Sequence, residues 1–329
     1  VLTPAQQSDM LGAGIHIRTN AYIIDDRVVA GYEPVSKTFS LDKPSSYALL
    51  TGWGYYLDNK RSLLDSPGEW YYNRVLGKLY VWTPDGKRPE GRIEAGYVLQ
   101  GIDIRTKSYI TIDGLRIEKM GTGIDSSYSD GVIIRNVAVA DSHVNGIRSH
   151  AARNGLIEYS TIERSVREGI WVQKATSFEI RNNSIQSSGT VGTPKRSFGA
   201  IYAEHGNNIL IRKNNIFDSG YIGIYGMGTS IDIFSNYIEN SCTVLDDCGA
   251  IYTYVVNSPN TVNISQNIIV HSIGNSFGRP TNTLSAAQGI YLDNMANGTR
   301  VSGNTIIDAD YGIQVHDAHS NVFEGNVVY

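Results

Sequence analysis

From about residue 108 onward, apolar and polar positions alternate with period two, and the alternation itself repeats. Each unit places an apolar residue three positions before an Asn or Ser, and the shortest spacing between units is 22–24 residues. Period-two alternation predicts β-strands, and a fixed repeat near this length predicts a solenoid. The eight units are Ile133/Asn136, Ile157/Ser160, Ile180/Asn183, Ile211/Asn214, Ile233/Asn236, Ile264/Asn267, Val301/Asn304 and Phe323/Asn326.

A second motif, Gly or Ala followed by Ile, also recurs once per unit, from Gly123-Ile124 to Gly312-Ile313. Ile and Val dominate and Gly and Asn punctuate the turns, whereas a leucine-rich repeat would need regular leucines and a helical return. We therefore predict an all-β fold, a right-handed parallel β-helix with about 22–24 residues per coil. The repeated Asn is expected at a corner, bonded to the Asn above and below and tolerant of left-handed backbone.

Residues 1–107 have strand character without the period. We expect N-terminal coils there, with a β-hairpin excursion around Trp70–Trp82, and a regular β-helix over residues 108–329. Residues 321–329 supply only the first strand of a coil, which would leave apolar strand edges open. The expectation is that the natural protein continues beyond Tyr329, with further domains or chain segments outside this sequence.

Composition narrows the function. The formal charge is −4 and only 18% of residues are charged, so no electrostatic footprint for nucleic acid is present. No apolar run is long enough for a transmembrane segment. Two cysteines exclude a disulfide scaffold and a four-cysteine zinc site, and we expect no metal and no cofactor. Cys242 and Cys248 are six positions apart, and we predict a bridge between them if the protein is exported, with two free thiols as the alternative.

The Gly-Ile motif predicts which side chains point outward, because strand neighbours alternate between faces. One outward column contains five consecutive aromatic residues, and these are Trp171, Tyr202, Tyr225, Tyr252 and Tyr291. A second column contains His150, Glu204, Asp293 and His316. An exposed aromatic column predicts a platform for a sugar chain, with His150 and Arg196 as further substrate contacts. The alternative is that long loops of the protein itself cover the rings.

The chain resembles the pectate-lyase-like superfamily of right-handed parallel β-helix, carbohydrate-active proteins. The resemblance rests on Gly199–Tyr202, on Asp246–Tyr252, and on the hairpin at Pro67–Trp82, and it extends over residues 45–329. The nearest branch is that of β-helix glycoside hydrolases with fucosidase, xylosidase or xylanase activity. It implies catalytic carboxylates at Asp246 or Asp247 and at Asp293, although this chain has Cys248 where the branch usually has Gly.

The residues independently allow a glycosidase, which needs two carboxylates on either side of one bond. Asp247 and Asp293 fall on adjacent coils, and sequence leaves open whether Asp246 replaces Asp247. Glu204 lies three coils from Asp293, so it suits a substrate contact or a reserve acid. His316 is one coil from Asp293 and is either a catalytic partner or an ordinary ion pair.

Two other functions remain open. A polysaccharide lyase acting on a uronate polymer needs a base and a cation, for which Arg148, His150, Lys174 and Arg196 are available. No cluster of carboxylates suits Ca²⁺. A non-catalytic glycan-binding surface protein or adhesin would use the tyrosines alone. All three functions imply a polysaccharide or oligosaccharide partner and a secreted or cell-surface protein, of bacterial origin by this interpretation.

Overall fold

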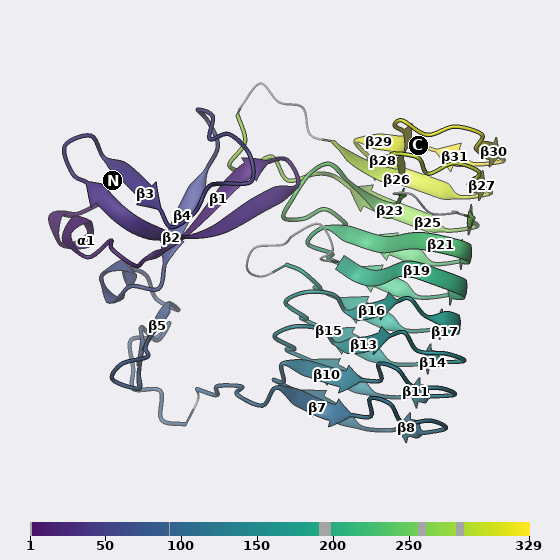
Figure 1. Ribbon diagram of the computed structural model, residues 1–329, viewed down its shortest axis with the longest axis horizontal. Helices are drawn as coiled ribbons and strands as arrows, with labels where there is room; N and C mark the ends of the chain where they lie inside the picture. The colour runs from purple at the N-terminus through teal and green to yellow at the C-terminus, as the bar shows by residue number, and fades with distance from the viewer. Residues whose placement is uncertain (1, 92, 191–198, 256–260, 281–285) are drawn as a thin grey trace. The chain divides into compact units, whose positions relative to one another are not determined.

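The computed structural model describes residues 2–91, 93–190, 199–255, 261–280 and 286–329 (Figure 1). The chain divides into two compact units. The first comprises Val1–Ala95 with Phe277–Thr283, and the second comprises Gly96–Ser276 with Leu284–Tyr329.

The second unit is a right-handed parallel β-helix, which confirms the predicted fold class. Its strands pair in parallel with the equivalent strands of the neighbouring coils and form three faces. The first face contains β7 (Gln100–Asp103), β10 (Thr122–Asp125), β13 (Ile147–His150), β16 (Ile170–Gln173), β19 (Gly199–Arg212), β21 (Ile222–Phe234), β23 (Cys248–Tyr254), β26 (Ala287–Asp293) and β29 (Tyr311–Val315).

The second face also includes the later parts of the long strands β19 and β21, which turn the corner without a break. Its other strands are β8 (Thr111–Asp113), β11 (Ile133–Arg135), β14 (Leu156–Glu158), β17 (Thr176–Arg181), β24 (Val262–Ser265), β27 (Arg300–Ser302) and β30 (Val322–Glu324). The third face contains β9 (Arg116–Glu118), β12 (Ala138–Ala140), β15 (Thr161–Glu163), β18 (Ser184–Gln186), β20 (Asn215–Phe217), β22 (Tyr237–Glu239), β25 (Ile268–Ser272), β28 (Thr305–Ala309) and β31 (Val327–Val328).

The Gly-Ile motif builds the core of the first face. The isoleucines from Ile124 to Ile290 stack in register and are at most 1% exposed. The preceding glycine is required by close approach between coils. A Cβ at Gly146 would lie 2.5 Å from Ile162 Cγ2 and 2.6 Å from the Gly169 carbonyl oxygen. This spacing admits only a hydrogen atom there.

The repeated Asn forms a buried amide ladder. In each step, one Oδ1 accepts both the backbone N–H and the Nδ2 of the Asn in the preceding coil, at 2.9–3.1 Å. The ladder runs through Asn183, Asn214, Asn236, Asn267, Asn304 and Asn326. The ladder predicted from the repeat is therefore present in these coils.

Two details of that prediction were wrong. The left-handed backbone falls on the residue before the ladder Asn, as at Asn182, Lys213 and Ser235, because the amide itself must point into the coil. The first of the eight sequence repeats is also shifted by one position. Ile134, not Ile133, lies opposite Ile157, and Asn136 is an exposed corner residue that donates to Asp113.

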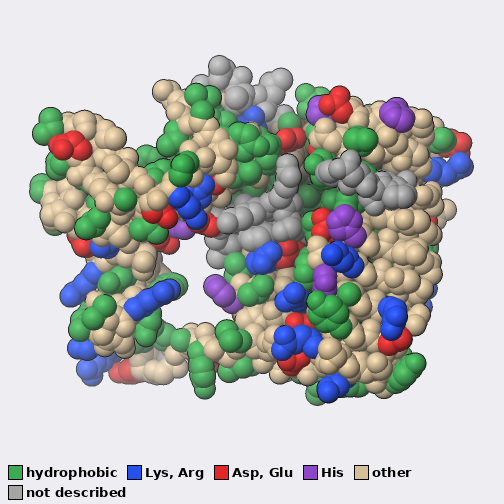
Figure 2. Space-filling view, in the orientation of Figure 1, with side chains coloured by type: hydrophobic (Ala, Val, Ile, Leu, Met, Phe, Trp, Pro, Cys, Tyr) green, Lys and Arg blue, Asp and Glu red, His purple; other side chains and the backbone are tan. Residues whose placement is uncertain are grey.

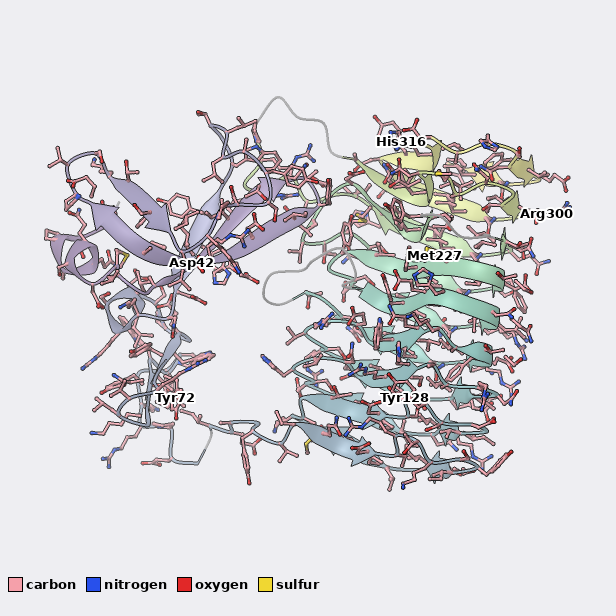
Figure 3. The ribbon with its side chains drawn as sticks, viewed as in Figure 1. Asp42, Tyr72, Tyr128, Met227, Arg300 and His316 are labelled. Atoms are coloured by element: carbon pink, nitrogen blue, oxygen red, sulfur yellow. A yellow bond between two sulfur atoms is a disulfide. The ribbon has the colours of Figure 1, made fainter. Side chains whose placement is uncertain are left out.

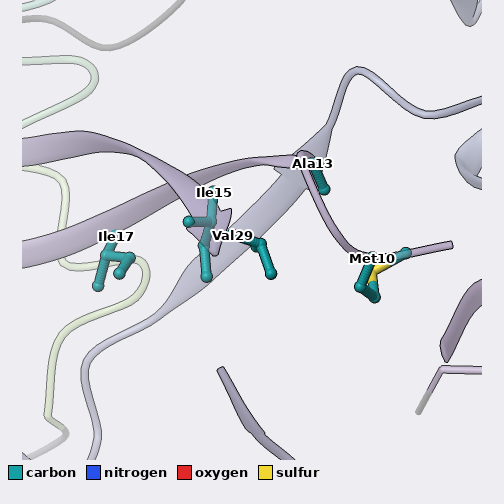
Figure 4. Packing of buried hydrophobic residues seen from close by; sticks show 5 residues of the cluster. All are labelled: Met10, Ala13, Ile15, Ile17 and Val29. Atoms are coloured by element: carbon teal, nitrogen blue, oxygen red, sulfur yellow. The ribbon is translucent and has the colours of Figure 1, made fainter. Parts of the chain in front are cut away.

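The first unit contains a four-stranded antiparallel sheet in the order β3-β2-β1-β4. Its strands are β1 (Gly14–Asn20), β2 (Ile23–Glu33), β3 (Thr38–Leu41) and β4 (Tyr55–Asp58), and it also contains helix α1 (Pro4–Ser8), the 3₁₀ helix η1 (Arg61–Leu63) and strands β5 (Trp70–Asn73) and β6 (Lys78–Val81). Met10, Ala13, Ile15, Ile17 and Val29 form its small core (Figure 4).

The hairpin of β5 and β6 confirms the predicted excursion. The coils expected before it are not formed, because β1 to β4 pair as antiparallel neighbours through short connections and parallel stacking begins only at β7. Within the same unit, the segment after Ser276 is attached to the sheet. Arg18 Nη1 donates to the Phe277 carbonyl at 2.7 Å, and the Gly54 N–H donates to the Gly278 carbonyl at 2.8 Å.

Candidate functional site

Strand register places the predicted outward residues in two columns on the first face of the β-helix. The aromatic column comprises Trp171, Tyr202, Tyr225, Tyr252 and Tyr291, each directly opposite the next. The second column aligns His150 with Gln173 and Glu204, Glu204 with Met227, and Tyr254 with Asp293. Met227 and His316 mark this face in Figure 3.

The rings from Tyr202 to Tyr291 contact one another in stacked, tilted and edge-on geometries, and this corrects the expectation that all five rings line an open groove. Ring centroids lie 4.5 Å apart for Tyr202 and Tyr225, 5.7 Å for Tyr225 and Tyr252, and 5.3 Å for Tyr252 and Tyr291. Tyr225 and Tyr291 are each only 5% exposed, because neighbouring rings cover one another. Trp171, Tyr202 and Tyr252 remain partly exposed and keep their place as candidate ligand contacts.

Asp247 and Asp293 meet at the end of this column. Burial is the main cause that raises the pKa of Tyr291, and the charges of Asp247 and Asp293 and hydrogen bonds to both carboxylates raise it further. Both carboxylates that sequence placed on adjacent coils are therefore near enough to Tyr291 to act on the same phenol.

Asp293 is only 8% exposed and accepts hydrogen bonds from several sides. Its Oδ2 accepts from the Tyr252 hydroxyl at 2.7 Å, and its Oδ1 accepts from the backbone and side-chain amides of Asn294, both at 2.9 Å. His316 Nδ1 lies 2.7 Å from Asp293 Oδ1. Burial is the main cause that raises the pKa of Tyr252, with Asp293 contributing, so this phenol stays a proton donor.

His316 is half exposed, with 50% of its side chain accessible. The hydrogen bond to Asp293 is the main cause that raises the pKa of His316, and the charges of Asp293, Asp317 and Asp247 add to it. The imidazole is therefore attracted to three carboxylates at this end of the face, and its protonated form is favoured by all of them.

The loop before β23 holds Asp246 and Asp247 inside a small disulfide ring. Cys242 and Cys248 are bridged, with a Cα–Cα distance of 6.2 Å, which confirms the predicted pairing. Asp246 is completely buried, whereas Asp247 is partly exposed and acts on Tyr291 and His316. Of the two, Asp247 is therefore the candidate for pairing with Asp293.

The remaining predicted residues lie elsewhere. Glu204 is in the column of Asp293 but three strands away, or about 14 Å at the usual strand spacing. It bonds Gln173 and raises the pKa of Tyr202, for which burial is the main cause. His150 stacks on Trp171 near the other end of the face, at 5.8 Å. Arg196 lies outside the described residues.

Sequence reasoning missed two residues at the carboxylate pair. The Tyr221 hydroxyl donates to the Asp247 carbonyl at 2.7 Å and so holds the loop, although Tyr221 precedes the Gly-Ile motif and belongs to no outward column. Asn294 supplies two donors to Asp293. The only signal for Asn294 was its place next to Asp293 at the end of a strand.

Comparison with known proteins identifies the family. The family model described as "Periplasmic copper-binding protein (NosD)" matches residues 80–282, more than half of the chain. The chain belongs to the NosD family. No curated protein matches it in sequence. None of the helices in the described part of the chain is long and apolar enough to cross a membrane.

Several solved β-helix structures are similar to the NosD-family chain. An alginate lyase from Paenibacillus sp. str. FPU-7 is 17% identical with a TM-score of 0.45, over 63% of this chain and 74% of the lyase. DFA-IIIase from Arthrobacter chlorophenolicus A6 is 17% identical with a TM-score of 0.46, over 63% and 48%. The surface protein and adhesin PfbA of Streptococcus pneumoniae is 15% identical with a TM-score of 0.37, over 63% and 69%. Similarity at this level does not carry the activity of any of these proteins over to this chain.

Proposed function

We propose that the protein is a glycoside hydrolase that cleaves a polysaccharide or oligosaccharide on the first face of its β-helix. The observation that carries the proposal is the pair of carboxylates Asp247 and Asp293, which both act on the Tyr291 phenol at the end of the aromatic column. Glycosidases use two carboxylates on either side of one bond. The partly exposed rings of Trp171, Tyr202 and Tyr252 give a sugar chain surface to pack against.

The surroundings of the two carboxylates suit different roles. Asp293 accepts hydrogen bonds from Tyr252 and Asn294 and lies beside His316, and this fixed position suits a nucleophile or base. Asp247 is then the acid that protonates the leaving oxygen. Tyr291 positions both groups, and His316 stabilises the charge on Asp293. Glu204 is a substrate contact further along the face.

The lyase alternative is less well supported. Elimination requires a cation at the uronate carboxylate, next to the base. His316 is the cation beside the carboxylate pair, whereas Arg148 lies five strands away, or about 24 Å. The arginine that a lyase centre would use is therefore far from the carboxylate pair, and the half-exposed His316 is the cation beside it.

The copper binding in the name of the family model was tested against the residues of this chain. Copper sites use thiolate, thioether and imidazole ligands. Both cysteines are bridged, and among the described residues no group of three or more His, Cys, Asp or Glu is placed to hold a metal ion. The donor set does not fit copper, and no step of the proposed reaction uses a metal.

The proposed location is secreted, periplasmic or at the cell surface. The bridge between Cys242 and Cys248 supports it, because disulfides persist in oxidising compartments. A polymeric substrate would also be met outside the cytoplasm.

The first experiment incubates the protein with a panel of neutral and acidic polysaccharides. Reducing ends and the ultraviolet absorbance of unsaturated products are both measured. Reducing ends without absorbance are expected. Unsaturated products would overturn the proposal in favour of a lyase, and binding without turnover would overturn it in favour of an adhesin.

The second experiment compares two Asp→Asn variants on the substrate found. Asp293→Asn is expected to lower kcat by several orders of magnitude, because it removes a reacting charge. Asp308→Asn is the matched control, since Asp308 also bonds a histidine at 2.7 Å, His271, on the third face. It should retain parental kcat. Equal activity of both variants would contradict the assignment.

A further inference from the structure

Arg148 and His150, at the N-terminal part of the same face, are two donors without hydrogen-bond acceptors. Arg148 Nε and His150 Nδ1 are buried atoms with no partner among the described residues. The nearest carboxylate oxygen to Arg148, on Asp125, is 3.9 Å from Nη1, beyond a hydrogen bond. Buried polar atoms in proteins are almost always paired, so these two call for an explanation.

Five other arginines of the β-helix each donate a hydrogen bond to a neighbouring carboxylate at 2.5–2.9 Å. These arginines are Arg135, Arg164, Arg181, Arg212 and Arg300. The carboxylates neutralise their charges on the corners and the other faces, whereas Arg153, like Arg148, has its nearest carboxylate beyond hydrogen-bond distance, at 3.7 Å. Arg148 differs in that it is on the face that carries the aromatic column.

Trp171 holds both donors in place. The Arg148 guanidinium carbon lies 4.7 Å from the Trp171 ring centroid, and the His150 ring stacks on the same indole at 5.8 Å and 16°. Tyr128 supports His150 from the other side, with ring centroids 5.2 Å apart. The Arg148 side chain is 40% exposed although its Nε is buried, so its two Nη atoms are the donors that can meet a ligand. A planar guanidinium binds a carboxylate or sulfate through parallel hydrogen bonds and can do so while stacked on an aromatic ring.

A hollow of about 440 Å³ lies on the N-terminal side of these residues and is lined by Asp103, Arg105, Thr106, Lys107 and Tyr128. Tyr128 connects it to the subsite through its ring contact with His150. Lys and Arg side chains together with histidine gather on the surface over β10, β13 and β16 (Figure 2). Arg105 is neutralised by Asp103, so the charge offered to a ligand comes from Lys107 and Arg148.

We propose that Arg148 and His150, braced by Trp171, form an anion subsite that binds the carboxylate or sulfate group of an acidic glycan. The subsite adds a substrate class, acidic glycans, to the proposed function. It rests on the proposed hydrolase activity only for the claim that the glycan bound at Arg148 is also cleaved. The subsite lies about 24 Å from the carboxylate pair, measured as five strand spacings. An acidic chain of several sugars lying along the first face would reach both.

Binding, measured by calorimetry without turnover, tests the subsite. The probes are uronate and sulfated oligosaccharides, each paired with its methyl-esterified or desulfated counterpart. We expect at least one acidic probe to bind 10-fold or more tightly than its neutral counterpart. A preference within the uronate pairs identifies a carboxylate ligand, and one within the sulfated pairs identifies a sulfate ligand. No preference in any pair would overturn the proposal.

Variants then assign the preference to the residues. Arg148→Gln should remove it, raising the Kd of the acidic probe about 10-fold or more and leaving the neutral probe unchanged. Arg148→Lys should restore it only in part, because an ammonium lacks the planar fork. The control is Arg153→Gln, which removes an exposed arginine 3.7 Å from Asp130. A preference that survives Arg148→Gln, or is lost equally in Arg153→Gln, would contradict the proposal.

This outcome is independent of catalysis. If Asp293→Asn retains turnover while Arg148→Gln loses the preference for acidic probes, the hydrolase assignment fails and the subsite stands. If Asp293→Asn abolishes turnover and Arg148→Gln keeps the parental preference for acidic probes, the subsite proposal fails and the hydrolase assignment stands.

Discussion

His16 lies between carboxylates from two neighbouring strands of the antiparallel sheet. Nδ1 is 2.7 Å from Asp26 on β2 and Nε2 is 3.1 Å from Asp58 on β4, and Tyr56 stacks on the ring at 4.4 Å. Burial lowers the pKa of His16, but the hydrogen bonds and charges of both aspartates outweigh it and raise the pKa to about 9. A protonated imidazole therefore ties three strands together, a role unrelated to the candidate site.

This histidine predicts a pH dependence for the first unit. Because the folded pKa is above the unfolded value of 6.5, the stabilisation is fully present below pH 6.5 and is lost as the pH rises through about 9. We expect a loss of about 1–2 kcal/mol, since the two aspartates are partly exposed and screened by solvent. Thermal unfolding at pH 6 to 10 measures it. His16→Gln should flatten the dependence, and an unchanged pH profile in that variant would contradict the assignment.

The strand and its corner are the element that this sequence repeats. At the corner, a residue with left-handed backbone follows the strand, and the ladder Asn comes directly after it. The side-chain amide of this Asn bonds the next coil. These residues are buried, so every amide donor and acceptor must be satisfied by a neighbouring coil. The ladder thus stabilises the stack of coils from Asn183 onward. In the coils before it, Val137 and Ser160 occupy the same position, and the Ser160 hydroxyl accepts from the Val137 N–H.

Adjacent asparagines in one corner allow a matched test of the ladder. Asn214 is buried and bonds Asn183, Asn236 and the Ile180 carbonyl, whereas its neighbour Asn215 is exposed. Asn214→Ala leaves several buried polar groups without hydrogen-bond partners and should lower the free energy of unfolding by at least about 2 kcal/mol. Asn215→Ala should change it by less than about 0.5 kcal/mol. Urea unfolding of both variants compares them, and equal effects would show that the ladder contributes no stability.

At the scale of the whole molecule, two hydrophobic cores share one chain. The first unit packs around Met10, Ile15 and Val29, and the second around the stacked isoleucines of the coils. The segment that leaves the β-helix after Ser276 belongs to the first unit, where Arg18 and Gly54 bond it. The chain therefore contributes to the first unit from two places far apart in sequence.

Separate cores predict separable unfolding. Ile15→Ala and Ile238→Ala each remove a buried side chain, 2% and 0% exposed, from the first and second units respectively. Each should cost about 2–5 kcal/mol in its own unit. Calorimetry is expected to show two transitions, with each variant shifting a different one. A single transition that both variants shift equally would mean that the units unfold together.

The sequence by itself determined the β-helix, the core and the in-register outward columns. These features are local and recur in the sequence of every coil. An error in one repeat, such as the shift at Ile133 and Asn136, is therefore confined to one coil. Three features could be established only from the tertiary structure. Contacts between rings leave Tyr225 and Tyr291 only 5% exposed, and the loop closed by the disulfide buries Asp246 and leaves Asp247 partly exposed. Antiparallel pairing replaced coils in residues before β7. Each depends on how strands, rings or loops pack against one another in space, and none leaves a periodic signal in the sequence.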